Sequence, residues 1–141
     1  MSDVVKFRFD VDGSDFSSAG AASVTVKKKL RQLGYSPEVI RRVSIAMYEG
    51  EINMVIHAGG GTAEVLVCEE YIEITLEDHG PGIKDIEEAM QAGVSTAPDN
   101  IRSLGFGAGM GLPNMKKHSD SMQIESTVGV GTKITMRVNM R

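Results

Sequence analysis

The chain has 141 residues, of which 41% are hydrophobic, and it carries 15 Lys and Arg against 19 Asp and Glu, a formal net charge of −4. This length suits one domain with a sizeable core, so we expect residues 1–141 to form a single domain. The acidic balance argues against a nucleic-acid-binding protein, and no apolar run approaches the roughly 18 residues of a membrane-spanning helix.

A single cysteine, Cys68, excludes an internal disulfide and fits a reducing compartment, so we expect a cytoplasmic protein. There is no Trp, and the aromatic content is only 5%, so the core must be aliphatic. Nine Met can fill irregular gaps in such a core or serve a partner-binding surface, and we favour the core.

The periodicity of apolar residues predicts a β-α-α-β-β-(α)-loop-α-β-β order, with a helix start signal at Ser36-Pro37. This order favours an α+β two-layer sandwich, a mainly antiparallel mixed sheet with helices on one face. The predicted strands are 4–11, 63–68, 71–78, 122–127 and 132–138. The predicted helices are 17–33, 37–58, 84–91 and 109–119, with a long loop over 93–108.

Four alternating glycines precede and open the helix predicted from residue 109. No Gly-Lys-Ser or Gly-Lys-Thr follows, which excludes a P-loop, and the strict dinucleotide-binding spacing also fails. Two interpretations remain, a flexible loop without function or a loop whose backbone N–H groups wrap a phosphate chain at a helix N-terminus. The four glycines are Gly105, Gly107, Gly109 and Gly111.

Three further elements carry candidate site residues. Glu49 and Asn53 are four residues apart and share a helical face, where the carboxylate could act as a general base and the amide oxygen could bind Mg²⁺. Asp78 ends a strand before Gly80 and Gly82, and it could accept a hydrogen bond from an exocyclic amine. Thr132 opens the last strand. Taken singly, these features also fit a solvated helix face and ordinary turns.

Together and in this order, the Glu-x-x-x-Asn, Asp-x-Gly-x-Gly, glycine-rich and Gly-Thr motifs resemble the superfamily of gyrase, heat-shock chaperone, histidine kinase and MutL ATPases (GHKL). The resemblance spans about residues 40–138. It implies the Bergerat ATP-binding fold. The run 109–136 is similar to the bacterial anti-sigma-factor and switch-protein serine/threonine kinases.

The resemblance also implies roles for the motif residues. Asn53 would hold Mg²⁺ against ATP, Glu49 would activate the attacking hydroxyl, and Asp78 would bind the adenine amine. The glycines after Asp78 would let the backbone approach the base, the glycine-rich segment would wrap the phosphates, and Thr132 would lie near the adenine. Glu51, two residues after Glu49, is expected to point elsewhere and to meet solvent.

The leading hypothesis is therefore an ATP-dependent serine/threonine kinase that phosphorylates a small anti-anti-sigma protein of the STAS type. Such a kinase could also sequester a sigma factor and form a homodimer. Two alternatives stay open: a non-catalytic, ATP-gated protein-binding module, and a stand-alone histidine-kinase-type catalytic domain.

Overall fold

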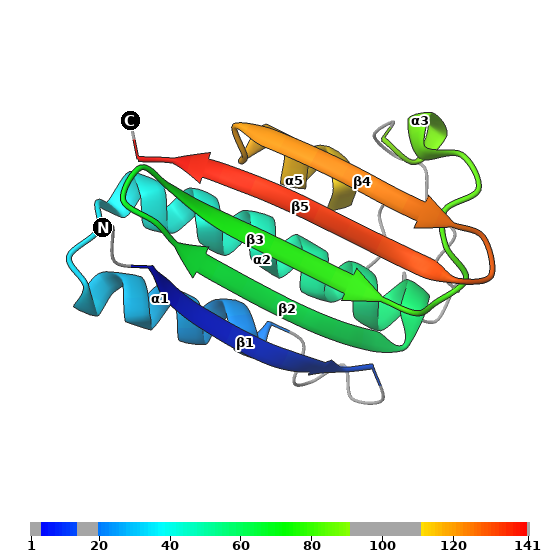
Figure 1. Ribbon diagram of the computed structural model, residues 1–141, viewed down its shortest axis with the longest axis horizontal. Helices are drawn as coiled ribbons and strands as arrows, with labels where there is room; N and C mark the ends of the chain where they lie inside the picture. The colour runs from blue at the N-terminus through cyan, green and yellow to red at the C-terminus, as the bar shows by residue number, and fades with distance from the viewer. Residues whose placement is uncertain (1–3, 14–19, 91–110, 141) are drawn as a thin grey trace, which may run out of the picture.

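The computed structural model describes residues 4–13, 20–90 and 111–140. Its described strands form one sheet in the order β1-β2-β3-β5-β4, and every neighbouring pair is antiparallel. Helices α1, α2 and α5 lie on one face of this sheet (Figure 1), which confirms the predicted two-layer α+β architecture. The strands are β1 (Val5–Asp12), β2 (Gly60–Val67), β3 (Tyr71–Asp78), β4 (Ser121–Thr127) and β5 (Gly131–Asn139). The helices are α1 (Ala21–Gln32), α2 (Pro37–Ala58), α3 (Ile86–Ala89) and α5 (Gly111–Lys117).

Helix α2 has the predicted bounds because both of its ends are set by local signals. The Ser36 side chain accepts a hydrogen bond from the Val39 backbone N–H at 3.2 Å, and Pro37 occupies the first turn. At the other end, Gly59 adopts a left-handed conformation with φ 73°. Its N–H bonds to the Met54 carbonyl, so the helix stops there.

Three helices are shorter than predicted. Gly20 has φ 94°, so α1 begins only at Ala21 instead of residue 17. Asp85 caps α3 by accepting a hydrogen bond from the Glu88 N–H, so this helix begins at Ile86 instead of residue 84, and it ends at Ala89. Helix α5 ends at Lys117, before the predicted residue 119. The predicted loop over 93–108 lies outside the described residues.

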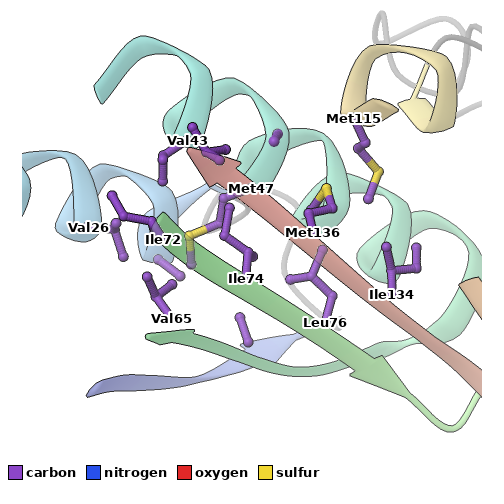
Figure 2. Close-up of a cluster of buried hydrophobic side chains, with 14 of the residues drawn as sticks. Val26, Val43, Met47, Val65, Ile72, Ile74, Leu76, Met115, Ile134 and Met136 are labelled. Atoms are coloured by element: carbon purple, nitrogen blue, oxygen red, sulfur yellow. The ribbon is translucent and has the colours of Figure 1, made fainter. Parts of the chain in front are cut away.

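The core lies between the sheet and the helices (Figure 2). Alternate residues of β2, β3 and β5 point toward the helices, as a two-residue period requires, and they are buried there. The inward-facing residues of β1 and β4 are only partly buried. Methionines fill much of this space, because Met47, Met115 and Met136 are all 0% exposed. Each buried side chain of this size contributes about 2 kcal/mol of hydrophobic free energy. The expectation of a Met-filled core is therefore confirmed.

The pairing of β3 with β5 brings two candidate site residues together at one end of the sheet. In this register Asp78, the last residue of β3, stands opposite Thr132 near the start of β5. The chain then turns through residues 79–82 beside the turn that joins β4 to β5, where the Gly129 N–H donates to the Pro81 carbonyl at 2.9 Å. Among the described residues, no helix is long and apolar enough to span a membrane.

Candidate functional site

The first group of candidate residues lies on α2 and is covered by α5. Glu49 and Asn53 are both partly buried and stand one helical turn apart. The Asn114 side-chain amide of α5 donates to Glu49 Oε1 at 3.5 Å. A Cβ added to Gly111 would lie 3.0 Å from Asn53 Oδ1, so the missing side chain lets the start of α5 approach this carboxamide closely.

Burial has a direct electrostatic effect on Glu49. Loss of solvent raises the pKa of the Glu49 carboxyl above its ordinary value. The hydrogen bond from Asn114 and the charge of His118 act in the opposite direction. The carboxyl is thus a stronger base than an exposed glutamate once it is ionised, which suits a group that must accept a proton.

The second group gathers around the Asp78 carboxylate at the end of β3. Asp78 Oδ1 accepts hydrogen bonds from the backbone N–H groups of Gly80, at 3.0 Å, and Thr132, at 3.2 Å. These two contacts fix the side chain and join β3 to β5. No further hydrogen bond to Oδ2 is present among residues 4–13, 20–90 and 111–140, so this oxygen can accept one from a ligand.

Ser126 was not predicted from the sequence, yet its hydroxyl links Thr132 to the segment after β3 through hydrogen bonds. Its hydroxyl accepts from the Ile83 N–H at 2.7 Å and lies 2.9 Å from Thr132 Oγ1. Gly82, at φ 78°, packs directly against the Thr127 carbonyl, where a side chain would not fit. The only sequence signal for Ser126 is its place on the inward-facing side of β4.

Helix α2 connects the two groups. Gly80 lies against Ala58, where a Cβ added to the glycine would come within 2.6 Å of the Ala58 Cβ. Ala58 follows Asn53 by five residues on the same helix, a rise of about 7.5 Å. The carboxylate of Asp78 and the carboxamide of Asn53 are therefore held by one rigid helix and the strand that ends beside it. The remaining glycine-loop residues, Gly105, Gly107 and Gly109, lie outside the described residues.

The expectation for Glu51 was half wrong. The side chain does point away from Glu49, but it is only 2% exposed. Its carboxylate accepts hydrogen bonds from the backbone N–H groups of Gly20, Ala22 and Ser23, which begin α1. Burial raises the pKa of Glu51, while these hydrogen bonds lower it. Glu51 therefore caps a neighbouring helix instead of meeting solvent.

Gly50 has a packing role next to the candidate base. A Cβ at this position would overlap the Leu76 Cδ1 atom and would lie 3.3 Å from the Met115 Cε atom. Glycine thus allows both β3 and α5 to pack tightly against α2 at this point. The cost of a glycine inside a helix is offset by this close approach.

No cluster of three or more His, Cys, Asp or Glu side chains that could hold a metal exists in the described part of the chain. A Mg²⁺ ion bound to a nucleotide does not need one, because it keeps several waters and takes oxygen ligands from the phosphates. The carboxamide oxygen of Asn53 is a suitable hard ligand for that arrangement. The donor set therefore fits magnesium only together with a phosphate ligand.

Comparison with protein families gives one match across most of the chain. The model of the family described as "Histidine kinase-like ATPase domain" matches residues 14–138. Similar proteins include an anti-sigma F factor of Clostridium perfringens strain SM101, 33% identical over 127 residues that cover 86% of this chain and 87% of the relative. An anti-sigma F factor of Clostridium acetobutylicum is 36% identical over 121 residues, 82% of this chain and 81% of the relative.

Two solved structures share the fold at low sequence identity. The RsbU and RsbW domains of a Mycobacterium tuberculosis protein match with a TM-score of 0.65 at 14% identity, over 95% of this chain and 32% of that one. The SiaB–SiaC complex of Pseudomonas aeruginosa matches with a TM-score of 0.56 at 11% identity, over 94% of this chain and 89% of that one. These likenesses support the fold described above.

Proposed function

Because the chain belongs to the histidine kinase-like ATPase family, we propose that it is an ATP-dependent serine/threonine protein kinase of the anti-sigma-factor type. It phosphorylates a small anti-anti-sigma partner of the STAS type and regulates transcription or a stress response by partner switching in the cytoplasm. The observation that carries the proposal is the likeness to anti-sigma F factors, at 33% identity over 127 residues. A sigma factor as the second partner and a homodimer as the working form belong to the same proposal.

The purine binds at the end of β3. Asp78 Oδ1 is already occupied by the N–H groups of Gly80 and Thr132, so Oδ2 accepts the hydrogen bond from the exocyclic amine of adenine. A carboxylate here selects a donor and disfavours guanine, which presents a carbonyl oxygen at the same position. Thr132 and the backbone at Gly80 and Gly82 border the base.

The phosphates extend from this end toward Asn53. Asn53 Oδ1 would hold the magnesium ion, which on binding neutralises charge on the β- and γ-phosphates. The four glycines from Gly105 to Gly111 would supply backbone N–H groups to the same phosphates. Support comes from the contact of Gly111 with Asn53, which brings the start of α5 to the carboxamide.

Glu49 acts as the general base. The acceptor hydroxyl oxygen forms a bond to the γ-phosphorus while the bond to the β,γ-bridging oxygen breaks, and ADP leaves. The hydroxyl proton moves to the Glu49 carboxylate and from there to solvent. Partial burial keeps this carboxylate basic, and phosphoryl transfer otherwise needs mainly positioning and charge neutralisation.

The test is a phosphotransfer assay with radiolabelled Mg-ATP and a panel of purified STAS-domain proteins from the host genome. We expect acid-stable phosphoserine or phosphothreonine on one of them. Glu49→Gln should abolish this transfer and keep ATP binding. Glu38→Gln, at an exposed position on the same helix, is the matched control and should transfer normally.

Each other outcome points to a specific alternative. Acid-labile phosphohistidine on an acceptor would indicate a histidine-kinase-type domain. ATP-dependent partner binding with no transfer to any acceptor would indicate a nucleotide-gated binding module. Transfer that survives Glu49→Gln would remove Glu49 from the role of base.

A further inference from the structure

Helix α5 contacts both candidate site residues of α2, Glu49 and Asn53. The two helices run antiparallel here, so Gly111 lies beside Asn53 and Asn114 lies beside Glu49. Residues three or four apart on a helix share a face. One face of α5 therefore meets the face of α2 that carries the candidate base and the candidate magnesium ligand.

In the contact between Asn114 and Glu49, the donor and the acceptor can be assigned without ambiguity. An ionised carboxylate can only accept hydrogen bonds, so the Asn114 atom that faces Glu49 Oε1 at 3.5 Å is the donor Nδ2. Within the described part of the chain, no other group donates to this carboxylate. The separation is long, but hydrogen bonds around catalytic groups often shorten only when substrate binds.

We propose that Asn114 is a positioning residue for phosphoryl transfer, which holds Oε1 of Glu49 and so leaves Oε2 to receive the proton of the acceptor hydroxyl. This inference rests on the proposed function, because it assigns Asn114 a part in the same reaction. Asn114 is assigned to act through Glu49, because its side-chain amide donates to that carboxylate.

Helix α5 is anchored well enough to hold Asn114 in place. The neighbouring Met115 is fully buried and packs against α2 at Gly50, the residue directly after Glu49. On the following turn, His118 Nδ1 lies 2.8 Å from the Asn114 carbonyl oxygen, where the ring N–H can donate. The side chain and the backbone of Asn114 are thus held from both directions.

The electrostatic setting agrees with this role. Burial disfavours the ionised form of Glu49, and the Asn114 amide and the charge of His118 both favour it. Within the described residues, His118 is the titratable group whose charge acts on Glu49. Asn114 therefore orients the carboxylate and opposes the rise in the Glu49 pKa that burial causes.

The experiment uses the full chain and the STAS-domain acceptor that the phosphotransfer assay identifies. Asn114→Ala should lower kcat by about 10-fold or more, since small displacements of catalytic groups have effects of this size, and should leave the ATP dissociation constant unchanged. Asn139→Ala, an exposed Asn at the end of β5, is the matched control and should keep wild-type kcat. In a Glu49→Gln background, Asn114→Ala should cause no further loss.

A second variant tests the contact without any acceptor. Asn114→Asp keeps the shape but replaces the donor with a negative charge, which should raise the pKa of Glu49. This pKa can be measured by carbon-13 NMR of the Glu49 carboxyl, assigned with Glu49→Gln. If the residue at position 114 did not contact Glu49 in solution, this substitution would leave the Glu49 titration unchanged.

The failure of this inference differs from failure of the proposed function. If Glu49→Gln abolishes transfer but Asn114→Ala retains full kcat, or if Asn114→Asp leaves the Glu49 titration unchanged, the role of Asn114 is refuted and the kinase stands. If Glu49→Gln retains transfer, the base itself is misassigned, and the inference about Asn114 fails with it.

Discussion

The Glu51 carboxylate lies 2.6 Å from the backbone nitrogen of Ser23, which is 28 residues earlier in the chain. The same carboxylate accepts the N–H groups of Gly20 and Ala22. These are the orphan donors at the N-terminus of α1, where the helix dipole also favours negative charge. One side chain of α2 therefore caps α1 and joins the two helices.

Removal of this cap should destabilise the protein. Glu51→Ala leaves three buried N–H groups without their acceptor, and we expect a loss of about 3 kcal/mol in the free energy of unfolding. Glu51→Gln keeps one acceptor oxygen and should lose less. Urea denaturation measures both, with the exposed Glu69→Ala as a control. A Glu51→Ala variant as stable as the control would show that the cap contributes nothing.

Gly50→Ala should also be destabilising, against the intrinsic preference of helices for alanine. The gain in helix propensity is up to about 1 kcal/mol. The new Cβ would overlap Leu76 and crowd Met115, and overpacking typically costs about 1–3 kcal/mol. We therefore expect net destabilisation of about 1 kcal/mol in urea denaturation.

A double-mutant cycle identifies the cause of that loss. Leu76→Ala removes the atoms that the new Cβ would meet, so the effects of Gly50→Ala and Leu76→Ala should be less than additive. Strict additivity of the two free-energy changes would contradict the steric explanation.

Asp78→Asn should weaken ATP binding with little effect on folding. The amide oxygen can still accept from the Gly80 and Thr132 N–H groups, but the NH₂ group then faces the adenine amine. Loss of a hydrogen bond to a charged group costs about 1.5–3 kcal/mol, which corresponds to roughly a 10- to 100-fold increase in the dissociation constant for ATP. Titration with a fluorescent ATP analogue measures it, and the exposed neighbour Glu77→Gln should bind normally. Equal affinity in both variants would remove Asp78 from the purine site.

The stability of the protein should fall in mild acid partly because of His57. Burial lowers the pKa of His57 from its ordinary value of 6.5. As pH falls through that value, the unfolded chain takes up a proton that the folded chain resists, so the folded state loses stability. Between pH 7.5 and 5.5, wild type should lose more unfolding free energy than His57→Gln does. Parallel pH profiles of the two proteins would show that His57 makes no contribution.

The fold was largely predictable because its signals are local. Ser36-Pro37 and Gly59 set both ends of α2, and the periodicity of apolar residues predicted each of the five strands. Asp78 and Thr132 were proposed for the same site from motif order, and the β3–β5 register pairs them directly. Their roles in ligand binding stay predictions.

The parts that were missed depend on contacts between distant segments. Glu51 was expected in solvent because its own helix gives no sign that the first N–H groups of α1 would need an acceptor there. Asn114 and Ser126 were overlooked for the same reason, since each acts on a residue more than 40 positions away or on another strand. The packing role of Gly50 became clear only once Leu76 and Met115 were placed around it.

Isothermal titration calorimetry with ATP, in the presence of Mg²⁺ and then of a chelator, tests the account most directly. We predict saturable binding heat with magnesium, a much weaker signal without it, and loss of the magnesium-dependent part in Asn53→Ala. Wild-type protein that gives no heat with ATP, or the same heat with magnesium and with chelator, would contradict the account.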